Sequence, residues 1–122
     1  MVTAVTNFGR SGVADWLVQR VGGVILLLWL CFAGAILLGN PDLGYQEWKA
    51  VFEATWVRIF SLAALLSLAA HAWVGLWCTL TDYITPRLIG AHANLLRGVL
   101  VLVCIATLFI YVVWGIQIIW GI

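Results

Sequence analysis

Three long stretches without Asp, Glu, Lys or Arg dominate the sequence: residues 21–38, 59–80 and 98–122. A helix needs about 17–25 mostly apolar residues to cross the hydrocarbon core of a bilayer. Composition agrees, because 65% of the residues are hydrophobic and 9% are charged. We therefore expect an all-α membrane protein with three transmembrane helices, forming a single domain over residues 1–122. A cleavable signal peptide is the alternative for the first stretch, but that stretch exceeds the apolar region of such signals, about 7–15 residues.

The charge and cysteine content exclude several function classes. The formal net charge is +1, so no basic excess indicates a nucleic-acid partner. Cys31, Cys78 and Cys104 are widely spaced within the apolar stretches. This pattern indicates neither a disulfide framework nor a cysteine-based metal site. The lipid bilayer is the partner that the composition predicts.

The distribution of basic residues predicts the orientation. Of the six Lys and Arg residues, four lie in the N-terminal segment and the second loop, and two lie in the first loop among three acidic residues. Because cytoplasmic loops carry an excess of Lys and Arg, we expect a cytoplasmic N-terminus and a C-terminus on the opposite side.

Aromatic residues in the first loop recur at helical spacing: Tyr45, Trp48, Phe52 and Trp56. This spacing predicts one short helix with its rings on a single face. Trp and Tyr side chains prefer the headgroup region, so we expect this helix to lie along the outer membrane interface, with anchoring as a sufficient explanation for the rings.

His71 lies midway along the second apolar stretch. An ionisable residue at that depth is costly, so we expect it to face protein, a cofactor or water. One interpretation is a neutral imidazole hydrogen-bonded to a neighbouring helix. The other is haem ligation, since a porphyrin can lie against a helix only where the flanking residues are small. Small or polar residues share the helical face of His71: Ala64, Ser67, Gly75, Cys78 and Asp82.

Electron transfer through a six-coordinate haem would need a second axial ligand. The other two apolar stretches contain no histidine, and His92 belongs to a predicted loop. If haem is bound, the sequence therefore predicts a partner subunit that supplies the other ligand.

Asp82 and Tyr83 end the second apolar helix on the predicted cytoplasmic side, roughly 16 Å along the axis from His71. Together they can orient a quinone, with the phenol donating a hydrogen bond to a quinone carbonyl. The alternatives are a solvated carboxylate and an interfacial tyrosine. Pro86 is expected to end or bend the helix. Arg20 begins the first apolar stretch on the same side, as a topological charge or as a partner for a haem propionate.

The segment HAWVGLWCTLTDYITP, residues 71–86, closely resembles the second-helix signature of one of the two hydrophobic membrane anchors of bacterial succinate dehydrogenase (complex II). The opening segment Gly9-Arg10-Ser-Gly12, followed by Asp15 and Val18-Gln-Arg20, is similar to the start of that family. With three spans and a similar length, the resemblance covers nearly the whole chain.

This resemblance implies a bundle of helices shared with a second membrane anchor subunit, together with a flavoprotein subunit and an iron–sulfur subunit. The chain would itself be non-catalytic, within a complex that passes electrons from succinate to ubiquinone in the bacterial inner membrane, with a periplasmic C-terminus. His71 would be one axial ligand of haem b and thus its metal ligand. Arg20 would lie near the haem propionates, and Tyr83 and Asp82 would belong to the ubiquinone site.

Other functions remain open on the sequence alone. A cofactor-free structural anchor would use His71 only to join helices, and a fumarate reductase anchor would carry the same signature. A small transporter would need more polar spans than these. The sequence leaves undecided the quinone species, the haem potential, the role of Gln117, and assembly into a trimer of heterotetramers.

Overall fold

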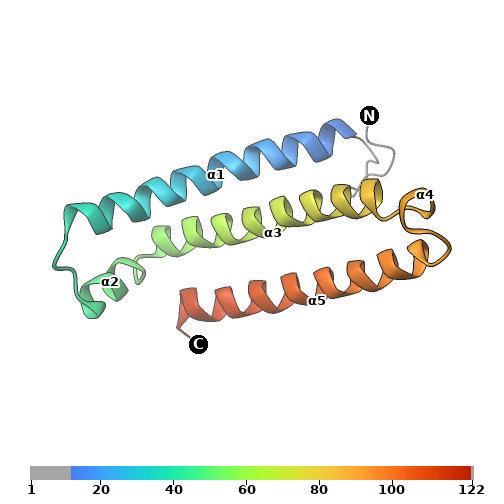
Figure 1. Ribbon diagram of the computed structural model, residues 1–122. Coiled ribbons are helices and arrows are strands. Elements are labelled where there is room, and N and C mark those ends of the chain that lie inside the picture. The colour runs from blue at the N-terminus through green and yellow to red at the C-terminus, as the bar shows by residue number, and fades with distance from the viewer. Residues whose placement is uncertain (1–11, 122) are drawn as a thin grey trace.

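The computed structural model describes residues 12–121 and consists there of helices and connecting turns. The long helices are α1 (Gly12–Gly39), α3 (Thr55–Tyr83) and α5 (Ala93–Trp120), and the short ones are α2 (Tyr45–Val51) and α4 (Pro86–Ile89). Helix α3 lies between α1 and α5 and runs antiparallel to both (Figure 1). All three are long and apolar enough to cross a membrane, which confirms the predicted fold class.

The long helices extend beyond the charge-free stretches at most of their ends. They contain 28, 29 and 28 residues, or roughly 42 Å each at 1.5 Å per residue. The hydrocarbon core is about 30 Å thick, so the first and last turns reach into the headgroup region, where polar residues are tolerated. The third helix ends at Trp120, where Gly121 adopts a left-handed cap with φ of 70°. Gly9 and Arg10 of the opening segment, and Ile122 at the end of the third stretch, lie outside the described residues.

The expectation that one helix carries all four loop aromatics is wrong. Helix α2 ends at Val51, with Phe52 as its cap, and Trp56 already belongs to α3. The chain turns at residues 52–54, between the two helices, and Arg58 Nε donates a hydrogen bond back to the Phe52 carbonyl at 2.9 Å. A single continuous helix could not both lie along the interface and then enter the membrane.

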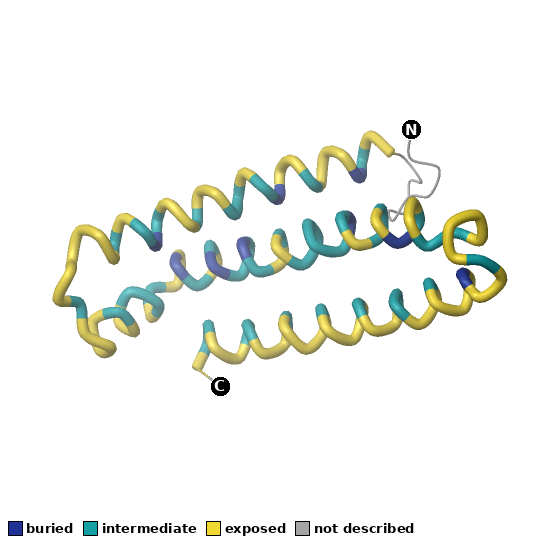
Figure 2. The backbone as a smooth tube through the Cα atoms, viewed as in Figure 1, coloured by how far each residue is buried: buried dark blue, intermediate teal, exposed yellow. Residues whose placement is uncertain are grey.

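Small residues allow the long helices to approach closely. A Cβ atom at Gly22 of α1 would lie 3.4 Å from the Ser67 carbonyl oxygen of α3. At Gly115 of α5, a Cβ atom would lie 2.6 Å from Leu65 of α3. Trp29 Nε1 also donates a hydrogen bond to Ser61 Oγ across the α1–α3 contact, at 3.0 Å. Helix α3 carries most of the buried positions, whereas α5 is largely exposed (Figure 2).

The second connection between long helices begins where α3 ends. Tyr83 is the last residue of α3, and Pro86 begins α4, as expected from the missing N–H group of proline. The turn closes at Gly90, whose φ of 106° favours glycine. This connection brings the end of α3 beside the start of α5.

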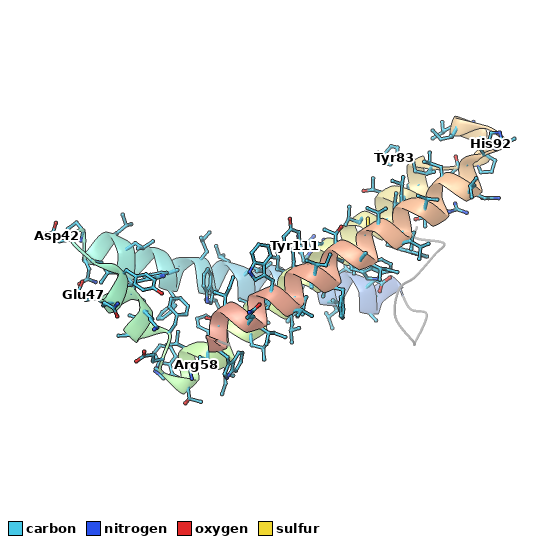
Figure 3. The ribbon with its side chains drawn as sticks, turned by 90° about the horizontal axis from the view of Figure 1, so that it is seen from below. Asp42, Glu47, Arg58, Tyr83, His92 and Tyr111 are labelled. Carbon is cyan, nitrogen blue, oxygen red and sulfur yellow. The ribbon has the colours of Figure 1, made fainter. Side chains whose placement is uncertain are left out.

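Polar side chains gather at the two ends of the helices. Asp42, Glu47 and Arg58 lie near one end, and Tyr83 and His92 lie near the other (Figure 3). Tyr111 lies between the two groups, along α5. The surface between the two groups carries many large exposed apolar side chains, among them Leu28, Leu102 and Phe109, as suits contact with lipid or other membrane helices.

Candidate functional site

A cleft of about 670 Å³ opens between α1 and α3 near the end where α1 begins and α3 finishes. Helix α3 contributes His71, Gly75 and Cys78, which lie three and four residues apart and so share one face. Helix α1 contributes polar residues that include Gln19 and Arg20. Glycine at position 75 keeps the wall beside His71 free of a side chain.

The imidazole of His71 has an unfilled hydrogen-bonding requirement. Its Nδ1 atom is buried and has no hydrogen-bond partner among residues 12–121. Leaving a buried polar group unpaired costs about 1–3 kcal/mol, so such a group is usually satisfied by a ligand, water or a partner protein. No group of three or more His, Cys, Asp or Glu side chains within residues 12–121 is arranged to hold a metal ion. A single histidine in a roomy cleft fits an axial ligand of a larger group better than a metal site built by this protein alone.

Arg20 lines the same cleft as His71. Its guanidinium carbon lies 5.4 Å from the centre of the Trp16 ring, a cation–π distance. The side chain is exposed, so its charge is available to an anionic group in the cleft.

Two further polar residues of α1 line the cleft without having been assigned a role from the sequence. Asp15 is only 5% exposed. Gln19 places its Nε2 atom 3.9 Å from the Cβ position of Gly75, and its Oε1 atom is buried without a hydrogen-bond partner among residues 12–121. Their spacing along the sequence could have placed both residues on the face of Arg20, because residues 15, 16, 19, 20 and 23 share one side of a helix.

Asp82 and Tyr83 do not line this cleft. Both are exposed at the end of α3, and Tyr83 retains 65% of its accessible surface. The structure therefore brings His71 and Arg20 together, and it separates them from the Asp82–Tyr83 pair. The small residues predicted to share the helical face of His71 do not all line the cleft. Ser67 packs against Gly22, and Ala64 is buried farther along α3.

A second cavity, of about 370 Å³, lies toward the other end of the helices. It is lined almost wholly by apolar side chains of α1, α2, α3 and α5, among them Trp29, Trp48 and Leu65. Its polar group Ser61 already accepts the hydrogen bond from Trp29. This cavity therefore has room for an apolar group but presents almost no polar group that could bind or react with a ligand.

The fold and the cleft define a class: a three-span helical membrane protein with a histidine-bearing cleft between its first two spans. A family model described as the succinate dehydrogenase/fumarate reductase transmembrane subunit matches residues 3–113. A succinate dehydrogenase hydrophobic membrane anchor subunit from Coxiella burnetii is 32% identical over 116 residues, covering 95% of each chain. The chain therefore belongs to the succinate dehydrogenase/fumarate reductase transmembrane subunit family, in which it is a hydrophobic membrane anchor. The resemblance found in the sequence is confirmed.

Proposed function

We propose that this chain is the membrane anchor of a succinate:quinone oxidoreductase that supplies one axial ligand to haem b and part of a ubiquinone site. As a single membrane domain, it would tether the flavoprotein and iron–sulfur subunits together with a second anchor subunit. The observation that carries the proposal is the position of His71, in the wall of a cleft of about 670 Å³ with a buried, unpartnered Nδ1.

The cleft fits a haem in size and in chemistry. Ligand pockets commonly measure about 300–1,000 Å³. The imidazole of His71, whose Nδ1 is buried and unpartnered, offers a ring nitrogen as an axial ligand of iron. The glycines Gly23 and Gly75 leave room for a flat macrocycle beside the helices. Arg20 is available to pair with a propionate, a charge-assisted interaction.

When bound, haem supplies one-electron redox chemistry, and the protein sets its potential through the axial ligands and their surroundings. In the part of the chain that the structure describes, the cleft contains one histidine, so the second axial ligand would come from the second anchor subunit. The open side of the cleft leaves space for such a partner.

Tyr83 and Asp82 would form this chain's part of the ubiquinone site. The exposed phenol of Tyr83 is a hydrogen-bond donor suited to a quinone carbonyl. Asp82, beside it, would orient the headgroup or accept a hydrogen bond from the reduced quinol. We assign this end of the helices to the cytoplasmic side of the bacterial inner membrane, from the distribution of basic residues.

The test is to replace His71 in the purified complex and record its optical spectrum. His71→Ala is expected to abolish or shift the b-type haem absorbance, because the iron loses an axial ligand. His92→Ala is the matched control, since His92 is exposed on a loop and we expect it to leave the spectrum unchanged. A normal b-type spectrum in the His71→Ala complex would overturn the haem assignment. Absence of haem from the parent complex would instead indicate a cofactor-free anchor.

A further inference from the structure

We propose that Arg97 is a positioning residue for the quinone site: it holds the end of α3 so that Tyr83 is presented in a fixed place. This inference rests on the proposed role of Tyr83 in quinone binding. Arg97 lies in the first turns of α5, and Tyr83 is the last residue of α3. The two helices meet at this end through the turn that contains α4 (Figure 1).

The guanidinium of Arg97 makes two hydrogen bonds that together form a clamp. Its Nη1 donates to the carbonyl oxygen of Ile84 at 3.3 Å. Its Nη2 donates to Oδ1 of Asn94, one turn earlier in α5, at 3.0 Å. Asn94 thus orients the guanidinium, and the guanidinium holds the residue that follows Tyr83. Among the side-chain hydrogen bonds between described residues, this is the one that joins α5 to the end of α3.

The backbone around Tyr83 explains why such a clamp is needed. Ile84 leaves the helical conformation, with φ of −93° and ψ of 78°, and its N–H group bonds back to Leu80. In the following turn, backbone carbonyl groups are hydrogen-bonded to backbone N–H groups of the same turn. The Thr85 carbonyl accepts from Leu88 and Ile89, and the Pro86 carbonyl accepts from Gly90. The Ile84 carbonyl is instead held by Arg97.

The type of side chain also matters. A helix end carries partial negative charge on its last carbonyl groups, so a nearby cation stabilises it. Arginine offers several N–H donors in a planar fork, and one fork can reach Ile84 and Asn94 simultaneously. Lysine keeps the charge but has no such fork, so we expect it to hold the end of α3 less well.

Tyr83 itself has little else to fix its position. Its side chain is 65% exposed, and no hydrogen bond of its phenol to another described residue occurs. The phenol therefore depends on the backbone that carries it. Small displacements of a binding group weaken substrate positioning strongly, so loosening the Ile84 carbonyl would weaken quinone binding without removing any group that contacts the quinone.

The experiment measures ubiquinone reduction by the purified complex carrying Arg97→Gln, Arg97→Lys or Asn94→Ala. We expect Arg97→Gln to raise the apparent KM for a short-chain ubiquinone roughly tenfold, because the freed Ile84 carbonyl lets Tyr83 move out of position. Arg97→Lys and Asn94→Ala are expected to give smaller increases. Succinate oxidation with a soluble acceptor and the haem spectrum are expected to match the parent. Arg87→Gln is the control, because Arg87 is an exposed cation in the same turn.

The outcomes separate this inference from the proposed function. A purely structural role would lower the yield or haem content of the complex and leave the KM of the surviving molecules unchanged. An unchanged KM in Arg97→Gln, alongside impaired quinone reduction in Tyr83→Phe, would overturn the Arg97 inference alone. Normal quinone reduction in Tyr83→Phe would overturn the quinone assignment and this inference with it. If Arg97→Gln fails to assemble, Arg97→Lys decides, and an unchanged KM in that variant counts against the clamp.

Discussion

At the scale of single residues, the cleft contains buried polar atoms for which the described part of this chain supplies no hydrogen-bond partner. His71 Nδ1 and Gln19 Oε1 are both buried without hydrogen-bond partners among residues 12–121. Each unpaired group costs about 1–3 kcal/mol, and both lie where the second anchor and the cofactor are proposed to bind. The isolated anchor is therefore expected to be less stable than the assembled complex, because assembly can supply partners for these groups.

Arg20 is the first residue at which this idea can be tested. Arg20→Gln removes the cation that we assign to a haem propionate, so haem is expected to dissociate roughly ten times faster from the detergent-purified complex. The measurement is the decay of b-type absorbance after addition of a haem acceptor such as apomyoglobin. Arg87→Gln serves as the control because it removes an equal charge outside the cleft. Equal decay rates for parent and Arg20→Gln would contradict the propionate assignment.

Tyr83 supplies the second residue-scale prediction. Tyr83→Phe removes only the phenol oxygen of an exposed side chain, so we expect no change in folding. The loss of one donor to the quinone is expected to reduce kcat/KM for ubiquinone by about tenfold or more. Succinate oxidation with a soluble acceptor provides the internal control, since that reaction bypasses the membrane site. Parental quinone kinetics would remove the hydrogen bond from the proposal.

At the scale of helices, the cleft depends on how closely α1 approaches α3. Gly22 lies against the Ser67 carbonyl, next to the turn of α1 that carries Arg20 and Gly23. In a membrane, helices associate through close packing of such small residues. A larger residue at position 22 would push the helices apart and displace the two walls of the cleft relative to each other.

Substitution at this crossing gives the element-scale prediction. We expect Gly22→Leu to lower the thermal midpoint of the complex by several degrees and to reduce its haem content, because the added side chain begins where α1 already contacts the backbone of α3. Gly34→Leu is the matched control on the same helix, since a Cβ atom at Gly34 would meet nothing within 4 Å. Similar midpoints for the two variants would show that the close α1–α3 approach is unimportant.

The same helices show what could be predicted from the sequence and what could not. The uncharged stretches predicted the three spans because hydrocarbon excludes charge, but they could not locate helix ends within the headgroup region. Periodicity placed Gly75 and Cys78 beside His71, since both lie on one helix. It could not reveal Gln19 opposite Gly75 or Arg97 beside Ile84, because contacts between helices depend on how they cross. For the same reason, the loop aromatics were assigned to one helix when they occupy two.

At the scale of the whole molecule, the distribution of polar groups ties orientation to function. The cleft and the Tyr83 region lie toward one end, and the more acidic loop with α2 lies at the other (Figures 1 and 3). The proposed quinone site faces the cytoplasm only if the basic residues near His92 are cytoplasmic. Orientation is therefore a direct test of the proposed electron path from the soluble subunits.

Cysteine labelling can decide this orientation. In a variant whose three native cysteines are replaced by alanine, Asp42→Cys and His92→Cys place single thiols at opposite ends of the molecule. We expect a membrane-impermeant maleimide to label Asp42→Cys in intact spheroplasts, since that loop would face the periplasm. His92→Cys is expected to react only after the membrane is permeabilised. A denatured sample of each variant controls for thiol reactivity, because the soluble subunits could cover position 92 in the native complex. Labelling of His92→Cys but not Asp42→Cys in intact spheroplasts would place Tyr83 on the periplasmic side, away from a cytoplasmic iron–sulfur subunit, and the proposed route to quinone would fail.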